Sequence, residues 1–369
     1  MSPESPKRLV FFLLLIGGLS GISLLPGEPV EITSPELRGA IQPQVAASPA
    51  GTIHAVFGLK ESGAIYHVAS VDGGRTYSQP ARVGELPKLA LGMRRGPRSS
   101  ATDKVVTITA ISHSDGNLHA WNSTDDGKTW SRCPPINEVP KRAGEGLHAM
   151  VGDGAGNVFV TWLDGRNQGT ELWGAASADG GLSWGANSLV YRSPDGSICE
   201  CCHPSAAMDS GGRLAVAWRN WLGGSRDMYV AMSRDGGKEF GPARKLGDGT
   251  WPLEGCPMDG GAIGFDEEGR LLTVWRREGD VFATVDEESE QQIAGAALQP
   301  VIAVGKENPQ FLWESEGALM RSSLAAAVPV RMAEKAKFAA AASLPDGGSV
   351  VVWESEIDGT TVLLAEILD

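Results

Sequence analysis

The segment SICECCHPS packs Cys199, Cys201, Cys202 and His203 into a single short stretch of chain. Thiolates favour copper or zinc, and imidazole is a ligand for both metals. Cysteines also form disulfides, which an oxidising compartment permits. The chain has five cysteines in all, so full pairing would leave one thiol over. Two interpretations of this cysteine cluster therefore stay open, a copper or zinc site and a structural disulfide.

A motif that occurs four times indicates the framework that must position this cluster. It reads SVDGGRTY, STDDGKTW, SADGGLSW and SRDGGKEF, at intervals of 53, 54 and 56 residues. In each copy an aspartate can accept hydrogen bonds from backbone amides just ahead, and glycines allow the positive φ of a tight turn. We therefore interpret the aspartates as structural and not catalytic: Asp72, Asp125, Asp179 and Asp235.

Around these motifs, short alternating apolar segments recur between glycine, aspartate and proline turns. Examples are VFVTWLDG, RLAVAWRN, RLLTVWRR, QFLWESEG and SVVVWESE, and we count seven such units in the chain. Repeating units of this length predict an all-β, seven-bladed β-propeller that forms one domain over residues 29–369. A six-bladed ring is the alternative, because residues 300–333 are short for a blade. The last unit has three strands, so we expect PVEITS near residue 30 to close the ring.

The predicted register places four more residues relative to the cluster. His148, the cysteine cluster, and Cys256 with Met258 precede the innermost strands of three successive blades. We expect them to converge at one mouth of the central channel, while Cys133 follows the second motif on an outer strand, away from the mouth. The disulfide alternatives pair Cys256 with Cys201 or Cys202, or Cys199 with one of its neighbours.

Charge and the N-terminus narrow the class of protein. A net charge of −13 and a pI near 5.0 exclude nucleic acid as an expected partner. Lys7 and Arg8 precede an apolar run over residues 9–25 and a Pro-Gly break. This pattern predicts a signal peptide over residues 1–26 and an exported protein, whether periplasmic, at the cell surface or secreted. An uncleaved N-terminal membrane anchor is the alternative, and only then would a membrane be a partner.

The four motifs resemble the Asp-box (BNR) repeats of the sialidase superfamily, and the resemblance covers nearly all of residues 29–369. It implies that the boxes lie on the face opposite the functional site. It also implies that a glycan or small ligand binds at the mouth face, where sialidases use three arginines, a tyrosine nucleophile and an aspartic acid/base. The family's Arg-Ile-Pro motif is absent here, the nearest basic segment being RRGPRSS, and no tyrosine follows Tyr229.

Several charged residues on predicted loops or strand ends are candidates for the chemistry that the resemblance implies. The anion contacts would be Arg98, Arg219 and Arg276. The carboxylate candidates are Asp164, Asp227, Glu314 and Glu354. Such residues on propeller loops are more often solvated surface charge.

Three functions follow from these patterns. The first is an exported, sialidase-like propeller that binds or cleaves a glycan at the mouth. The second is a scaffold for a Cys/His/Met site that holds copper or zinc or performs redox chemistry. The third is a propeller that binds another protein.

Overall fold

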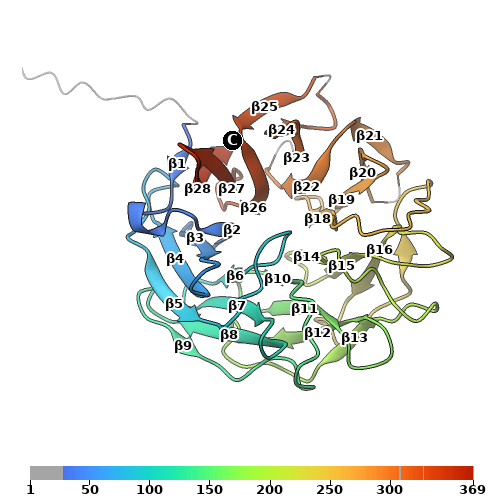
Figure 1. The fold of residues 1–369 in the computed structure, drawn as a ribbon, viewed down its shortest axis with the longest axis horizontal. Coiled ribbons are helices and arrows are strands. Elements are labelled where there is room, and N and C mark those ends of the chain that lie inside the picture. The colour runs from blue at the N-terminus through green and yellow to red at the C-terminus, as the bar shows by residue number, and fades with distance from the viewer. Residues whose placement is uncertain (1–27, 287, 307–308, 327, 369) are drawn as a thin grey trace, which may run out of the picture.

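A computed structural model describes residues 28–286, 288–306, 309–326 and 328–368. The described chain forms seven four-stranded antiparallel sheets and one short 3-10 helix, η1 (Pro35–Leu37). Figure 1 shows the sheets arranged as blades around a central axis. The seven-bladed prediction is confirmed and the six-bladed alternative is wrong, because the short stretch near residue 300 forms a complete blade.

The strands of each blade follow one another from the axis outwards, and we number the blades by their order along the chain. Blade 1 consists of β2 (Ile41–Ala47), β3 (Ile53–Gly58), β4 (Ala64–Ser70) and β5 (Ala81–Glu85). Blade 2 consists of β6 (Arg98–Ala101), β7 (Val106–Ser112), β8 (Asn117–Ser123) and β9 (Ser131–Arg132). Blade 3 consists of β10 (His148–Gly152), β11 (Val158–Asp164), β12 (Glu171–Ser177) and β13 (Ser188–Tyr191). Blade 4 consists of β14 (Ser205–Met208), β15 (Leu214–Arg219), β16 (Met228–Ser233) and β17 (Arg244–Lys245). Blade 5 consists of β18 (Ala262–Phe265), β19 (Leu271–Arg277), β20 (Asp280–Val285) and β21 (Gln291–Ala294). Blade 6 consists of β22 (Leu298–Ala303), β23 (Gln310–Ser315), β24 (Ala318–Ser322) and β25 (Val330–Glu334). Blade 7 is β26 (Ala336–Ser343), β27 (Ser349–Ile357), β28 (Thr360–Leu368) and β1 (Val30–Glu31).

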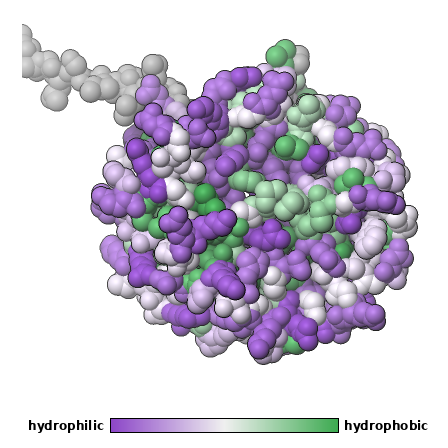
Figure 2. Space-filling view, viewed as in Figure 1, coloured by the Kyte–Doolittle hydropathy of each residue, from purple (hydrophilic) through white to green (hydrophobic). Residues whose placement is uncertain are grey.

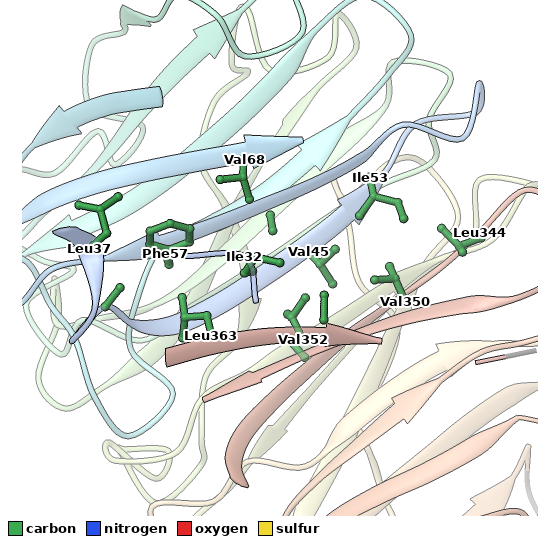
Figure 3. Close-up of a cluster of buried hydrophobic side chains, with 14 residues drawn as sticks. Ile32, Leu37, Val45, Ile53, Phe57, Val68, Leu344, Val350, Val352 and Leu363 are labelled. Carbon is green, nitrogen blue, oxygen red and sulfur yellow. The ribbon is translucent and has the colours of Figure 1, made fainter. Parts of the chain in front are cut away.

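The first strand closes the ring, as the sequence predicts. Strand β1 pairs antiparallel with β28, so the N-terminal segment supplies the outer strand of the last blade. The core between blades 7 and 1 then takes side chains from both ends of the chain, and Figure 3 shows Ile32, Phe57, Val352 and Leu363 close together there. Burial of this apolar surface stabilises the closed ring.

Each Asp box is a hydrogen-bonded turn between the third and fourth strands of a blade. In the second box, Asp125 accepts bonds from Ser123 Oγ at 2.7 Å and from Thr129 N at 2.9 Å. Ser123 Oγ in turn accepts the amide of Gly127 at 2.8 Å. The boxes of Asp72, Asp179 and Asp235 repeat this pattern. The structural interpretation of these aspartates agrees with this geometry.

We expect Asp72→Ala to lower the melting temperature by about 1–3 °C, because several hydrogen bonds of the first box are lost. Bonds from Thr76 lower the pKa of Asp72 to about 2. Because the pKa is lowered in the folded protein, the Asp72 carboxylate stabilises the fold above pH 3.8, the ordinary pKa of an aspartate. This stabilisation is lost as the pH falls towards 2. Thermal melts between pH 2 and 7 measure both effects. Arg75→Ala in the same turn is the control, since the exposed Arg75 side chain should leave the melting temperature unchanged.

The predicted signal peptide or anchor, residues 1–26, lies outside the described residues. Among the residues described, no helix has the length and hydrophobicity needed to span a membrane.

Candidate functional site

The mouth face is built from two sets of loops: those between the second and third strands of each blade, and those that lead into each innermost strand. It lies opposite the Asp boxes because neighbouring strands are antiparallel. The loop between β5 and β6 runs near the centre of the ring (Figure 1). On the Asp-box side the channel widens into a cavity of about 670 Å³, lined by the last residues of the innermost strands. The predicted site residues lie towards the other end.

The cysteine cluster lies in the loop that leads from β13 to β14. Cys199 Sγ is 3.6 Å from Cys201 Sγ and 3.4 Å from Cys202 Sγ, and the three sulfurs lie within 4.8 Å of one another. Cys256, in the loop from β17 to β18, interacts with Cys201. All five cysteines of the chain have free thiols in the structure. One loop thus gathers three thiols at the mouth, and the neighbouring loop adds Cys256 next to Cys201.

An arginine bonds directly to this cluster. Arg226 Nη1 donates to Cys199 Sγ at 3.1 Å, and Arg226 Nε donates to the carbonyl of Leu253 at 3.2 Å. Hydrogen bonds with Cys201 and Cys202 hold the pKa of Cys199 well below its ordinary value, and the positive charge of Arg226 lowers it further. Burial raises the pKa of Cys202. The arrangement therefore favours a thiolate at Cys199.

The histidines of the predicted constellation bond elsewhere. His148 Nε2 lies 3.0 Å from Thr109 Oγ1, and His203 Nε2 lies 3.2 Å from the carbonyl of Gly261. His148 is buried and His203 is half-buried, and desolvation lowers the pKa values of both imidazoles well below the ordinary range. Met258 contributes its backbone carbonyl, which accepts a bond from a glutamine side chain at 2.9 Å. The repeat register correctly places the thiols close together. The histidine side chains point elsewhere, and they bond to Thr109 and to the carbonyl of Gly261.

The repeat places four candidate residues at one position. Each follows the tryptophan of a second strand in blades 4 to 7: Arg219, Arg276, Glu314 and Glu354. Arg219 is 1% exposed and donates to the carbonyls of Asp259, Arg226 and Arg276 at 2.7 to 3.0 Å. The guanidinium of Arg219 is thus engaged by the protein itself, which favours a structural role over the predicted anion contact.

Glu314 and Glu354 each hold the following blade. Glu314 Oε1 accepts the amide of Phe338 in blade 7 at 2.7 Å, and Glu354 Oε1 accepts the amide of Gln42 in blade 1 at 2.9 Å. Phe338 and Gln42 lie at β-bulges of innermost strands, with φ of 52° and 58°. Burial raises the pKa of both glutamates. These carboxyls therefore connect blades through otherwise strained backbone.

Asp259, which the sequence interpretation missed, makes the same kind of contact. Its Oδ2 accepts the amide of Gln299 in blade 6 at 2.8 Å, again at a bulge with φ of 53°. Its Oδ1 is buried without a hydrogen-bond partner. The repeated residue pattern WES marks Glu314 and Glu354, but Asp259 precedes its innermost strand and carries no such signal.

Arg94, also missed, joins the central loop to the far side of the ring. It is buried, and it donates to Gln299 Oε1 at 2.7 Å, to the Gln299 carbonyl at 2.8 Å and to the carbonyl of Ala339. Its positive charge acts on Glu314 and counters the raised pKa there. Blade 2 is thereby connected to blades 6 and 7 across the channel.

The remaining candidates do not gather at one place. Arg98 donates to the carbonyls of Arg94, Gly96 and Pro97, and Asp164 is fully buried against Trp162 Nε1 and Arg166. Asp227 accepts bonds from Thr250 and Trp251, and Arg276 lies 5.4 Å from the ring centre of Trp251. The structure thus does not assemble the predicted arginines and carboxylates into one catalytic group.

An exposed aromatic side chain stands beside the cysteine cluster. Trp221, in the loop between β15 and β16, is 47% exposed, and the guanidinium of Arg226 lies 5.0 Å from its ring centre. The loop is anchored because Ser193 donates to the Trp221 carbonyl and Asp195 accepts the Gly223 amide. On the face viewed in Figure 2, hydrophilic side chains dominate the rim and hydrophobic ones lie nearer the centre.

No family model and no curated protein matches the sequence. Among solved structures, the chain is similar to an α-L-arabinanase from Penicillium chrysogenum complexed with arabinobiose, at 15% identity and a TM-score of 0.58, over 94% of this chain and 98% of that one. It is also similar to an ulvan lyase, at 12% identity and a TM-score of 0.56, over 93% and 98% of the two chains. The NanB sialidase from Streptococcus pneumoniae matches at 12% identity and a TM-score of 0.50, over 94% and 71%. These similarities show a sialidase-like propeller fold.

Proposed function

We propose that this protein is an exported, sialidase-like propeller that recognises an acidic glycan on its mouth face. The observation that carries the proposal is the exposed Trp221 stacked with Arg226 on an anchored loop. An aromatic face binds the apolar side of a sugar ring, and a guanidinium pairs with a carboxylate or sulfate. The basic and apolar N-terminal segment supports export.

Recognition is favoured over hydrolysis because the expected catalytic side chains have other partners. Arg98 and Arg219 donate to backbone carbonyls, and Glu314 and Glu354 hold backbone amides of the next blade. Most glycoside hydrolases use two carboxyls that reach the substrate, and sialidases use a tyrosine nucleophile with an aspartic acid/base. Because Glu314 and Glu354 already hold backbone amides, we favour binding over hydrolysis at the mouth.

The fold neighbours support a saccharide as the ligand class. The arabinanase is complexed with arabinobiose, and the ulvan lyase is bound to GlcA(1-4)Rha3S. Both proteins share the propeller fold over more than nine tenths of this chain. Fold alone does not determine function, so Trp221 and Arg226 carry the specific assignment.

We expect Trp221→Ala to weaken binding of an acidic oligosaccharide by about tenfold, which corresponds to a loss of about 1.4 kcal/mol. Isothermal titration with sialylated, uronate-containing and neutral oligosaccharides measures the affinity. Val71→Ala is the matched control, because Val71 is 83% exposed on the Asp-box face. Equal affinities for both variants, or no binding of any saccharide by the unmodified protein, would contradict the proposal.

A further inference from the structure

Three thiols of the cysteine cluster surround one point. The sulfur of Cys199 lies 3.6 Å from that of Cys201 and 3.4 Å from that of Cys202, which is close to the spacing of sulfurs that share a metal ion. An ion with metal–sulfur bonds of about 2.3 Å and tetrahedral geometry separates its sulfurs by about 3.8 Å. Small side-chain rotations would therefore admit an ion without moving the backbone.

A disulfide would use this geometry less completely. One disulfide joins two sulfurs, so at least one thiol of Cys199, Cys201 and Cys202 would stay unpaired. Cys199 and Cys202 are both 1% exposed, so a thiol left unpaired at either position could not form a hydrogen bond with water. A bound ion would use all three sulfurs. Cys256, in the neighbouring loop, interacts with Cys201 and is the candidate for a fourth ligand.

A positive charge lies against the cluster. Arg226 donates to Cys199 Sγ at 3.1 Å and to the neutral carbonyl of Leu253, so its guanidinium faces sulfur. Three or four thiolates on a cation would carry a net negative charge that balances this guanidinium.

The cluster is also accessible from solvent. Cys201 is half-buried and Cys256 is exposed, so one side of the group opens at the mouth face while Cys199 and Cys202 lie beneath. This combination of a buried base and an open side allows an ion to enter a site that the fold has already formed.

We propose that Cys199, Cys201 and Cys202, with Cys256 as the fourth ligand, bind one thiophilic d10 ion, Zn²⁺ or Cu⁺. The thiols lose their protons to solvent as the ion binds, and no oxidation is involved. The ion would connect the loops that lead into blades 4 and 5, beneath the Trp221 loop. None of the four cysteines belongs to the proposed glycan contact, but Arg226 is shared by the two sites, because it donates to Cys199 Sγ and lies against Trp221.

The test uses the whole protein, purified under reducing conditions, treated with a chelator and then titrated separately with Zn²⁺ and with Cu⁺. Elemental analysis after desalting should find one equivalent of metal per chain. Cys199→Ser and Cys201→Ser should each weaken binding by more than about tenfold. Cys133→Ser is the matched control and should bind as the unmodified protein does, because Cys133 lies after the outer strand of blade 2.

Spectra of the Co²⁺-substituted protein define the ligand set. Four thiolates give intense tetrahedral bands, and Cys256→Ser should change those bands while the protein keeps its fold, since Cys256 is exposed. The proposal is overturned if the reduced protein retains no stoichiometric metal, or if Cys133→Ser loses metal as fully as Cys199→Ser. It is also overturned if the native protein lacks metal and its intact mass is lower by the hydrogens of a disulfide. Metal content is measured without glycan, so these outcomes do not depend on the proposed function.

Discussion

Arg219→Ala is expected to lower the free energy of unfolding by about 3–5 kcal/mol, because it removes the hydrogen-bond donor of three carbonyls at once. Those carbonyls belong to Asp259, Arg226 and Arg276, so the loss is felt in blades 4 and 5 together. The alanine also leaves Trp251 without the guanidinium that lies 5.2 Å from its ring centre. Urea denaturation, followed by tryptophan fluorescence, measures the change.

Two further variants separate a structural role from ligand binding. Arg219→Lys keeps the charge, but its ammonium group cannot reach three carbonyls at once. Its free energy of unfolding should therefore lie between those of the unmodified protein and of the alanine variant. Arg82→Ala removes an exposed arginine that pairs with Glu85, and it should change stability by less than about 0.5 kcal/mol. If Arg219→Ala unfolds like Arg82→Ala yet loses glycan affinity, Arg219 is an anion contact after all.

The fold could be predicted because its signals are local and repeated. Each Asp box forms its hydrogen bonds within a few residues, so Asp125 could be interpreted without knowledge of distant parts of the chain. The closing strand could be predicted because the last unit lacked an outer strand and PVEITS had the right composition. Its pairing with β28 required only that the ring close.

The candidate site was harder to predict because its bonds join distant residues. Glu354 and Gln42 are separated by 312 positions, and Arg94 and Ala339 by 245. A charged residue at a strand end can point into solvent or bind a backbone amide of the next blade. The second outcome needs a β-bulge in that blade, and no sequence pattern marks where such a bulge forms. Cys199 and Cys202 lie close together along the chain, which is why the cluster itself could be predicted.

The contact between Glu354 and blade 1 has an effect on stability that depends on pH. Glu354 is 1% exposed and accepts bonds from the amide and the side chain of Gln42, while Lys337 Nζ lies 3.6 Å from its other oxygen. Burial raises the pKa of Glu354 above its ordinary value of 4.5, and the bonds from Gln42 and the charge of Lys337 oppose this rise. A raised carboxyl pKa stabilises the fold below pH 4.5, and this contribution is lost as the pH rises through the folded value.

Glu354→Ala should therefore lower the free energy of unfolding by about 2–4 kcal/mol at pH 5, since two bonds to Gln42 are lost and its buried amide is left without a partner. Glu354→Gln keeps an oxygen that can accept the Gln42 amide but cannot ionise. Its free energy of unfolding at pH 5 should therefore be close to that of the unmodified protein. Above pH 5 the unmodified protein should lose stability relative to Glu354→Gln, which has no charge to bury. Urea denaturation at pH 5, 6, 7 and 8 measures the three curves. Parallel curves for the glutamine variant and the unmodified protein would show that Glu354 keeps its ordinary pKa, and an unaffected alanine variant would show that it does not hold blade 1.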